Sequence, residues 1–159
     1  MSLRPREARA LDEWTALLRE RGVLAGGAPI PVRPFPASEG PGSLPDDIGA
    51  YFRGEAIVGL SARRCGLESV PDVTELAELE TLDLDGNPLA RLPEGLPRLR
   101  TLRMLSLYGS ALTEVPSAIG ELARLEYLSL GRAPLTSLPD AIWELQALRT
   151  LIVAETRLR

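Results

Sequence analysis

Leucines recur through the second half of this chain with a period of 23 residues. The stretch 79–101, LETLDLDGNPLARLPEGLPRLRT, is repeated in outline at 102–124 and 125–147. A unit one residue shorter occupies 57–78, and 148–159 contains only the first half of a unit. Repetition at this length is typical of a solenoid, in which each unit is one supersecondary element that packs against its copies. The sequence therefore predicts units that begin at 57, 79, 102, 125 and 148, the last one incomplete.

The spacing of leucines changes within each unit. Leu82 and Leu84 alternate with polar residues, as in a strand, where every second side chain lies on one face. From Leu89 to Leu99 the gaps widen to three or four residues, which is typical of a helix or a 3₁₀ turn. No unit buries enough apolar surface to fold alone, so the stability of the array is expected to come from stacking.

The pattern L-x-x-L-x-L-x-x-N-x-L, matched in full from Leu79 to Leu89, resembles the leucine-rich repeat. The added L-P-x-x-I/L-x-x-L is similar to the 23-residue class of intracellular plant, animal and bacterial proteins. The resemblance covers about residues 57–159. It implies an α/β fold, namely a right-handed solenoid with parallel strands on the concave face and short helical or 3₁₀ returns on the convex face.

Residues 1–24 are predicted to form an amphipathic helix, because Leu11, Trp14 and Leu18 lie on one helical stripe together with Leu17. We expect this N-terminal helix to pack on the first coil of the solenoid as a cap. The alternative is that it binds a partner or a second copy of the chain.

Two segments connect this helix to the repeats. Residues 25–42 are rich in proline and glycine and are interpreted as a linker without regular structure, the alternative being a proline-rich ligand for an aromatic groove. Residues 43–56 resemble the second half of a unit, because Leu44-Pro45 matches Leu92-Pro93. We interpret them as a degenerate half-repeat that caps the amino-terminal end.

Charge and cysteine content restrict the partners and the compartment. The chain has 18 basic and 22 acidic residues and a net charge of −4, which argues against general attraction to nucleic acid or to a membrane surface. Every basic residue is arginine, a bias that we attribute to a GC-rich, bacterial genome. The single cysteine favours a reducing compartment. We see neither an apolar span nor a Sec-type leader, and expect a cytoplasmic protein or, alternatively, an effector delivered into a host cell.

Few residues offer chemistry. The chain contains no histidine and no phosphate-binding glycine loop, so we predict no enzymatic activity, no cofactor and no metal. Cys65 lies where the family has Asn or Cys, and is expected to be a buried structural residue of the turn. Asp83 and Asp85 point to one face of a strand; we favour a solvated strand face over an acid/base pair or a weak cation site.

The position of Cys65 recurs as Asn87, Ser110, Ala133 and Thr156. An amide at this position of the family bonds neighbouring backbone, and the side chain of Ala133 can neither donate nor accept. We therefore expect a broken ladder there, which leaves the geometry of that turn open.

The exposed inner face is the remaining candidate site. Residues that alternate with the buried leucines are expected to point outward, with Arg63 neutralising part of the acidic pair. Tyrosine and methionine beside small residues are typical of interface hot spots, although a plain solvated sheet is a rival interpretation. The predicted partner-binding residues are Arg63, Asp83, Asp85, Met104, Ser106, Tyr108, Tyr127, Ser129 and Ile152.

These features favour a non-catalytic protein–protein interaction module that presents its concave strand face to a protein partner. One alternative, which comes from the resemblance, is the substrate-recognition portion of a bacterial effector ubiquitin ligase without its catalytic domain. Another is a structural element that assembles with itself through the open carboxyl end or the first helix.

Overall fold

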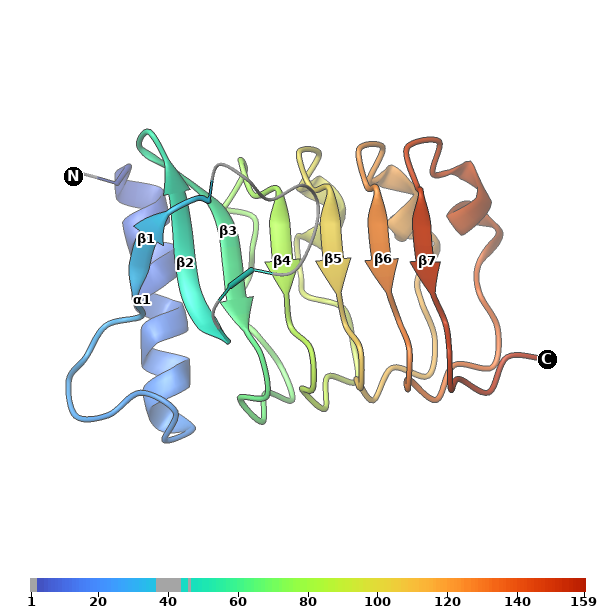
Figure 1. The fold of residues 1–159 in the computed structure, drawn as a ribbon, viewed down its shortest axis with the longest axis horizontal. Coiled ribbons are helices and arrows are strands. Elements are labelled where there is room, and N and C mark those ends of the chain that lie inside the picture. Colours follow the sequence, from blue (N-terminus) through green and yellow to red (C-terminus); the bar gives the residue numbers. More distant parts are fainter. Residues whose placement is uncertain (1–2, 37–43, 46) are drawn as a thin grey trace.

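The computed structural model describes residues 3–36, 44, 45 and 47–159, which form a curved sheet with helices on one side (Figure 1). Helix α1 (Pro5–Glu20) precedes the sheet. The 7-stranded sheet runs in sequence order: β1 (Val32–Pro34), β2 (Ile48–Arg53), β3 (Ala56–Ala62), β4 (Thr81–Asp83), β5 (Met104–Ser106), β6 (Tyr127–Ser129) and β7 (Thr150–Ile152). The 3₁₀ helices of the described part are η1 (Leu96–Arg98), η2 (Ser117–Glu121) and η3 (Asp140–Glu144).

One leucine from each of the strands β3 to β7 forms a continuous row through the core. Strands β3 to β7 pair in parallel, and their register aligns Leu60, Leu82, Leu105, Leu128 and Leu151. The first four of these side chains are fully buried at 0% exposure, and that of Leu151 is half-buried. The predicted leucine-rich repeat solenoid with parallel strands is therefore confirmed.

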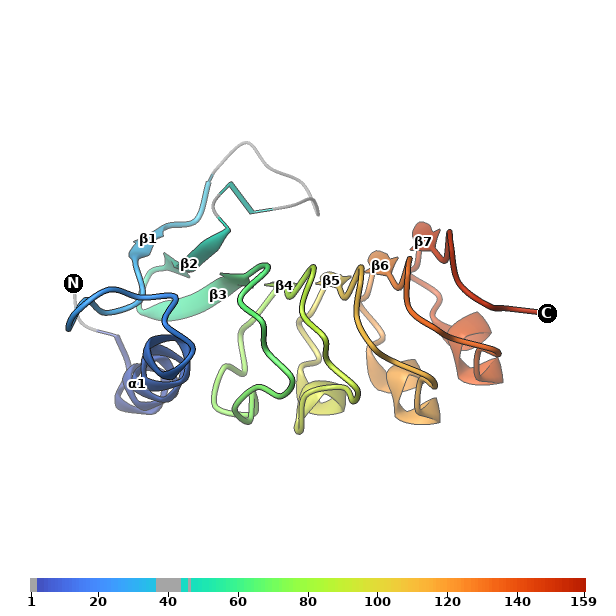
Figure 2. The same cartoon turned by 90° about the horizontal axis from the view of Figure 1, so that it is seen from below.

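The 3₁₀ helices of the returns are short, and each buries one large side chain. Helices η2 and η3 begin after Pro116 and Pro139, whose extended backbone turns the chain away from the sheet. Ile119 and Ile142 are the buried residues of these two helices. The returns lie on the outer side of the arc, and α1 lies in the same layer (Figure 2). The strands therefore line the concave face, as the family resemblance implies.

Helix α1 covers the amino-terminal end of the leucine stack. Its buried stripe of Leu11, Trp14 and Leu18 belongs to the same hydrophobic cluster as the repeat leucines. The Glu7 carboxylate accepts a hydrogen bond from the backbone N–H of Ile57 at 3.3 Å, so the helix is also tied to β3. Thr15 accepts a bond from the N–H of Ile30, which holds the following chain along the helix. The apolar stripe of α1 is therefore occupied within this chain.

Residues 48–53 differ from the sequence interpretation. They form strand β2, which pairs antiparallel with β3, whereas the half-repeat interpretation of 43–56 predicted a convex return. Strand β1 lies within the predicted irregular linker 25–42, where no regular structure was expected, and it pairs in parallel with β2. Residues 37–43 and 46 of these two segments lie outside the described residues. The L-P-x-x-I match was misleading because Gly54, at φ +63°, lets the chain reverse between two strand-forming runs.

The turns after the strands stack on one another through their backbones. Each has one residue in the left-handed region: Arg64, Gly86, Gly109, Arg132 and Glu155. The N–H of Gly86 donates to the carbonyl of Tyr108 at 2.7 Å, and that of Arg132 to the carbonyl of Ala154 at 2.9 Å. Arg132 directly precedes Ala133, so the turn keeps its geometry although Ala133 has no polar side chain.

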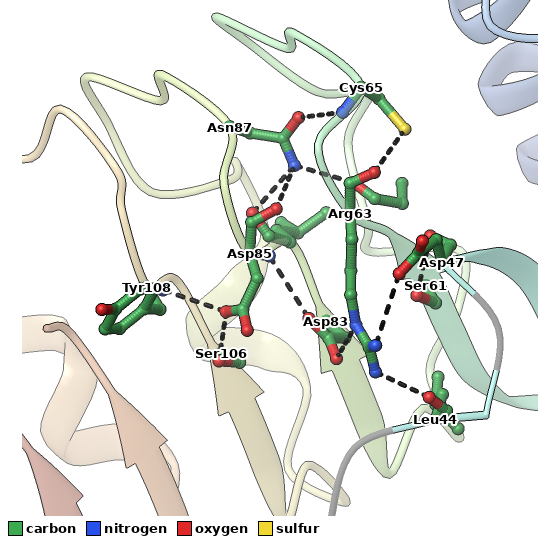
Figure 3. A network of polar contacts seen from close by, with 12 residues as sticks. Leu44, Asp47, Ser61, Arg63, Cys65, Asp83, Asp85, Asn87, Ser106 and Tyr108 are labelled. Carbon is green, nitrogen blue, oxygen red and sulfur yellow. Dashed lines mark hydrogen bonds and ion pairs between the residues drawn. The ribbon is translucent and has the colours of Figure 1, made fainter. Parts of the chain in front are cut away.

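Asn87 supplies the side-chain bonds of the first two turns (Figure 3). Its Oδ1 accepts from the N–H groups of Cys65 at 2.9 Å and Leu67 at 3.1 Å. Its Nδ2 donates to the carbonyls of Ala62 at 2.7 Å and Leu84 at 2.8 Å. One buried amide therefore satisfies four backbone groups in two successive units, as the family resemblance implies for this position.

We predict opposite behaviour for two residues at this same repeat position. Asn87→Ala leaves buried backbone donors and acceptors unpaired, and is expected to lower the free energy of unfolding by about 3 kcal/mol. The Ser110 hydroxyl is buried and has no hydrogen-bond partner among the described residues. Ser110→Ala is therefore expected to leave stability unchanged or to raise it slightly. Urea denaturation measures the free energy of unfolding of both variants. An equal loss in the two would contradict the role assigned to the Asn87 amide.

Candidate functional site

Strands β3 to β7 place two rows of side chains on the concave face, and the residues that directly follow the strands continue this face. In register, one row contains Gly59, Thr81, Met104, Tyr127 and Thr150, and the other contains Ser61, Asp83, Ser106, Ser129 and Ile152. Adjacent strands are about 4.8 Å apart, so a large side chain covers its smaller neighbours. The face therefore exposes its side chains unequally.

Several predicted partner-binding residues are not exposed. Asp83, Met104, Ser106 and Ser129 are buried on the concave face, so the expectation of a solvated Asp83 is wrong. Arg63, Asp85, Tyr108, Tyr127 and Ile152 are half-buried and keep accessible surface. The sequence identified which residues point to this side, but alternation along a strand does not report how far neighbouring side chains cover one another.

The amino-terminal end of the face is covered by residues that the repeat pattern does not place there. A Cβ atom added at Gly59 would lie 3.2 Å from atoms of Phe35, Leu44 and Tyr51. Leu44 is itself buried, at 2% exposure. Glycine at position 59 is needed because these side chains lie against the backbone of β3. The concave surface near β3 is therefore occupied by the chain itself.

Arg63 joins this covering segment to the sheet (Figure 3). Its Nε donates to Asp83 Oδ2 at 2.6 Å, and its Nη2 donates to the backbone carbonyl of Leu44 at 2.6 Å. Asp47 lies 3.5 Å from Nη1, and the Arg63 side chain is only 16% exposed. The predicted pairing of Arg63 with the acidic residues is confirmed, and Leu44 and Asp47 are additional partners.

Burial governs the ionisation of this pair. Desolvation and the nearby Asp85 carboxylate raise the pKa of Asp83, while the Arg63 guanidinium acts in the opposite direction. Burial lowers the pKa of Arg63, but Asp83, Asp47 and Asp85 outweigh it, so the net shift is upward. The arginine therefore remains charged, and its positive charge is shared among the carboxylates around it.

Asp85 connects β4 to the next unit. Its Oδ1 accepts from the Ser106 hydroxyl and, at 3.0 Å, from the backbone N–H of Tyr108. These two donors come from the following repeat, so they fix the orientation of the carboxylate. Among the described residues, no group of three or more His, Cys, Asp or Glu side chains is arranged to hold a metal ion.

Tyr108 is held in place by the unit that follows it. A Cβ atom at Gly131 would lie 2.8 Å from Cδ2 and 2.9 Å from Cε2 of the tyrosine, so the ring rests on the glycine. The Arg132 guanidinium lies 5.5 Å from the ring centroid and is paired with Glu155 at 3.0 Å. The lack of a side chain at Gly131 therefore makes room for the ring.

Tyr127 lies in register between Met104 and Thr150 on the same face. Burial raises the pKa of its phenol, a hydrogen bond with Ser129 opposes this shift, and the negative charges of Asp85 and Asp83 add to it. The two predicted tyrosines therefore lie on the open part of the face, and the acidic residues act electrostatically on Tyr127.

Cys65 has the structural role that its repeat position predicts. It is free and buried, and its thiol donates to the carbonyl of Arg63 at 3.1 Å. Burial, with a smaller contribution from the charge of Asp47, raises its pKa from 9.0 to about 11. Both effects disfavour the thiolate, which is the reactive form of cysteine.

We predict that Cys65 is inert in the folded protein. The raised pKa alone lowers the thiolate fraction at neutral pH by about 100-fold, and burial limits access further. The rate of alkylation by iodoacetamide is expected to rise by at least that factor when denaturant unfolds the chain. Similar rates for the folded and unfolded protein would show that the thiol is reactive.

The concave strands, 3₁₀ returns and stacked turns define a solenoid repeat protein. Residues 60–159 match the family model of the leucine-rich repeat region, so the chain belongs to the leucine-rich repeat family. None of the described helices is long and apolar enough to cross a membrane. A search of curated proteins finds no significant match to the chain.

Solved structures of leucine-rich repeat proteins resemble the chain. One from Leptospira interrogans is 37% identical over 55% of this chain and 22% of its own, with a TM-score of 0.53. Internalin C2 of Listeria monocytogenes is 29% identical over 60% of this chain and 41% of its own, with a TM-score of 0.55. The chain thus spans less than half of either protein's length.

A more distant structure shares the fold alone. The leucine-rich repeat ectodomain of the receptor kinase SOBIR1 from Arabidopsis thaliana is 21% identical, with a TM-score of 0.56. This match covers 99% of this chain and 96% of the other. The repeat architecture is therefore common to proteins of different organisms, and leucine-rich repeats are a common protein-interaction module.

Proposed function

We propose that this chain is a non-catalytic interaction module whose protein partner contacts the open part of the concave face, around Tyr108 and Tyr127. The observation that carries this proposal is the fixed position of Tyr108 between Gly131 and Arg132. A side chain that is already ordered loses little conformational entropy on binding, and tyrosine is enriched at interface hot spots. Ile152, a half-buried residue of β7, offers the partner an apolar side chain at the end of the same face.

Two further observations bear on the source of the protein and the compartment in which we propose that it works. The arginine-only basic composition and the similarity to proteins of Leptospira and Listeria favour a bacterial source. The single free cysteine favours a reducing compartment such as the cytoplasm. The proposed role needs no catalysis, and it fits a buried thiol at Cys65 and an Asp83 carboxylate that is paired with Arg63.

We predict that Tyr108→Ala combined with Tyr127→Ala reduces capture of the native partner by at least about tenfold, because a few aromatic residues dominate most interfaces. Trp143→Ala is the matched control, since Trp143 is 72% exposed and belongs to η3 on the outer side. Quantitative affinity capture from the source organism compares the two variants. Equal retention by the double variant and the control would place the interface elsewhere.

We predict a smaller, separate effect for Gly131→Ala. The new methyl group would displace the Tyr108 ring without removing it, so the loss tests the position of the ring rather than its presence. Capture is expected to fall by about fivefold, the effect of losing preorganisation, with circular dichroism retaining the wild-type spectrum. Undiminished capture would show that the fixed position of Tyr108 is not used in binding.

A further inference from the structure

Asp85 is the one acidic residue of the concave network that has no ion-pair partner among the described residues. Arg63 is bonded to Asp83 at 2.6 Å and lies near Asp47 at 3.5 Å, while Arg132 is paired with Glu155 at 3.0 Å. In the network drawn in Figure 3, three carboxylates therefore lie around a single guanidinium, which bonds Asp83 and lies near Asp47. Asp85 has no ion pair of its own on this half-buried surface, although it interacts electrostatically with Arg63 from farther away.

The Asp85 carboxylate is also oriented for a ligand. Both bonds from the next unit end on Oδ1, namely those from the Ser106 hydroxyl and the Tyr108 N–H. No hydrogen bond of the described residues ends on Oδ2, and the close-up shows that oxygen without a contact (Figure 3). A fixed carboxylate with one free oxygen is a strong acceptor for a charged donor.

Two tyrosines of the following units lie on the same side of the sheet as this carboxylate. Tyr108 is joined to Asp85 through its own backbone N–H, and its ring already carries one guanidinium, that of Arg132. Tyr127 lies two residues before Ser129, which pairs with Ser106, the residue whose hydroxyl bonds Asp85. No cation lies over the Tyr127 ring within the described part of the chain. A planar cation could bond the free oxygen while stacking on an aromatic face.

We propose that the concave face binds an arginine side chain of its protein partner, with the guanidinium on Asp85 Oδ2 and against the ring of Tyr127. The inference rests on the proposed interaction function and specifies the chemistry of the partner. Arginine fits better than lysine because its planar group donates in a fork and stacks on aromatic rings, whereas ammonium is a compact, strongly hydrated charge. An acidic partner is disfavoured by the same unpaired carboxylate.

Fluorescence anisotropy with two labelled probes tests this assignment, namely a hexapeptide of arginine and a hexapeptide of lysine. The arginine peptide is expected to bind the wild-type protein at least about threefold more tightly, because of its stacking and forked donors. Asp85→Asn keeps the shape of the side chain and removes its charge, and should weaken arginine-peptide binding about tenfold. Asp140→Asn, a matched loss of charge at the start of the outer helix η3, should have little effect.

Several results would overturn the inference. Equal weakening by Asp85→Asn and Asp140→Asn would indicate attraction to net charge alone. Equal affinity for the two peptides, or no binding of either, would exclude an arginine site. Tyr127→Leu preserves an apolar side chain without an aromatic face, and should remove the preference for arginine; if the preference persists, Tyr127 does not contact the guanidinium.

The same variants separate this inference from the proposed function. If the Tyr108 and Tyr127 double variant loses the native partner while Asp85→Asn retains it, the interaction face stands and the arginine site is wrong. If the arginine peptide binds through Asp85 but neither change affects the native partner, the arginine site stands and the proposed interface is wrong. Thermal unfolding of Asp85→Asn at the wild-type midpoint would show that the variant keeps the fold, so that a loss of binding comes from the lost charge.

Discussion

The in-register stacking of one leucine per strand is the interaction on which the rest of this structure depends. Leu82, Leu105 and Leu128 are wholly buried because each lies between the equivalent leucines of the two adjacent strands, and Leu60 is buried between Leu82 and Ala50 of β2. The backbone pairing that sets this register also stacks the turns above the strands. No unit makes either interaction by itself, so the stability of the array resides in the interfaces between units.

The same register determines which side chains of the concave face are buried and which are exposed. Parallel strands place equivalent residues side by side, so Asp83 meets Arg63 across adjacent strand positions and Tyr108 reaches Gly131 in the next unit. Contacts of this kind bury some side chains of the face and hold the exposed ones in one orientation. The open surface is therefore small and ordered, and its character comes from a few side chains that differ between units.

The sequence predicted the features that repetition determines. The buried leucines and the structural role of Cys65 follow from period and position, because these residues occupy equivalent places in successive units. The pairing of Arg63 with the acidic strand also followed, since alternation places both on one face of neighbouring strands. Features that recur in every unit can therefore be predicted from a single sequence, because the repetition itself reveals them.

The unpredicted features depend on contacts that occur once. Strand β2 was missed because Leu44-Pro45 imitates a repeat, while the reversal at Gly54 is a local signal that the repeat pattern obscured. The burial of Asp83 depends on Arg63, which is held in turn by Leu44 and Asp47 from a segment distant in sequence. Side-chain coverage across strands is a property of the assembled face, so spacing along one strand does not contain it.

Native-state hydrogen exchange of a Leu105→Ala variant tests most directly whether each unit depends on its neighbours. Removing this side chain should lower the protection of the amides of Leu82 and Leu128, in the strands on either side, as well as those of its own unit. A loss confined to residues 102–124, with both neighbouring strands as protected as in the unaltered chain, would contradict the account.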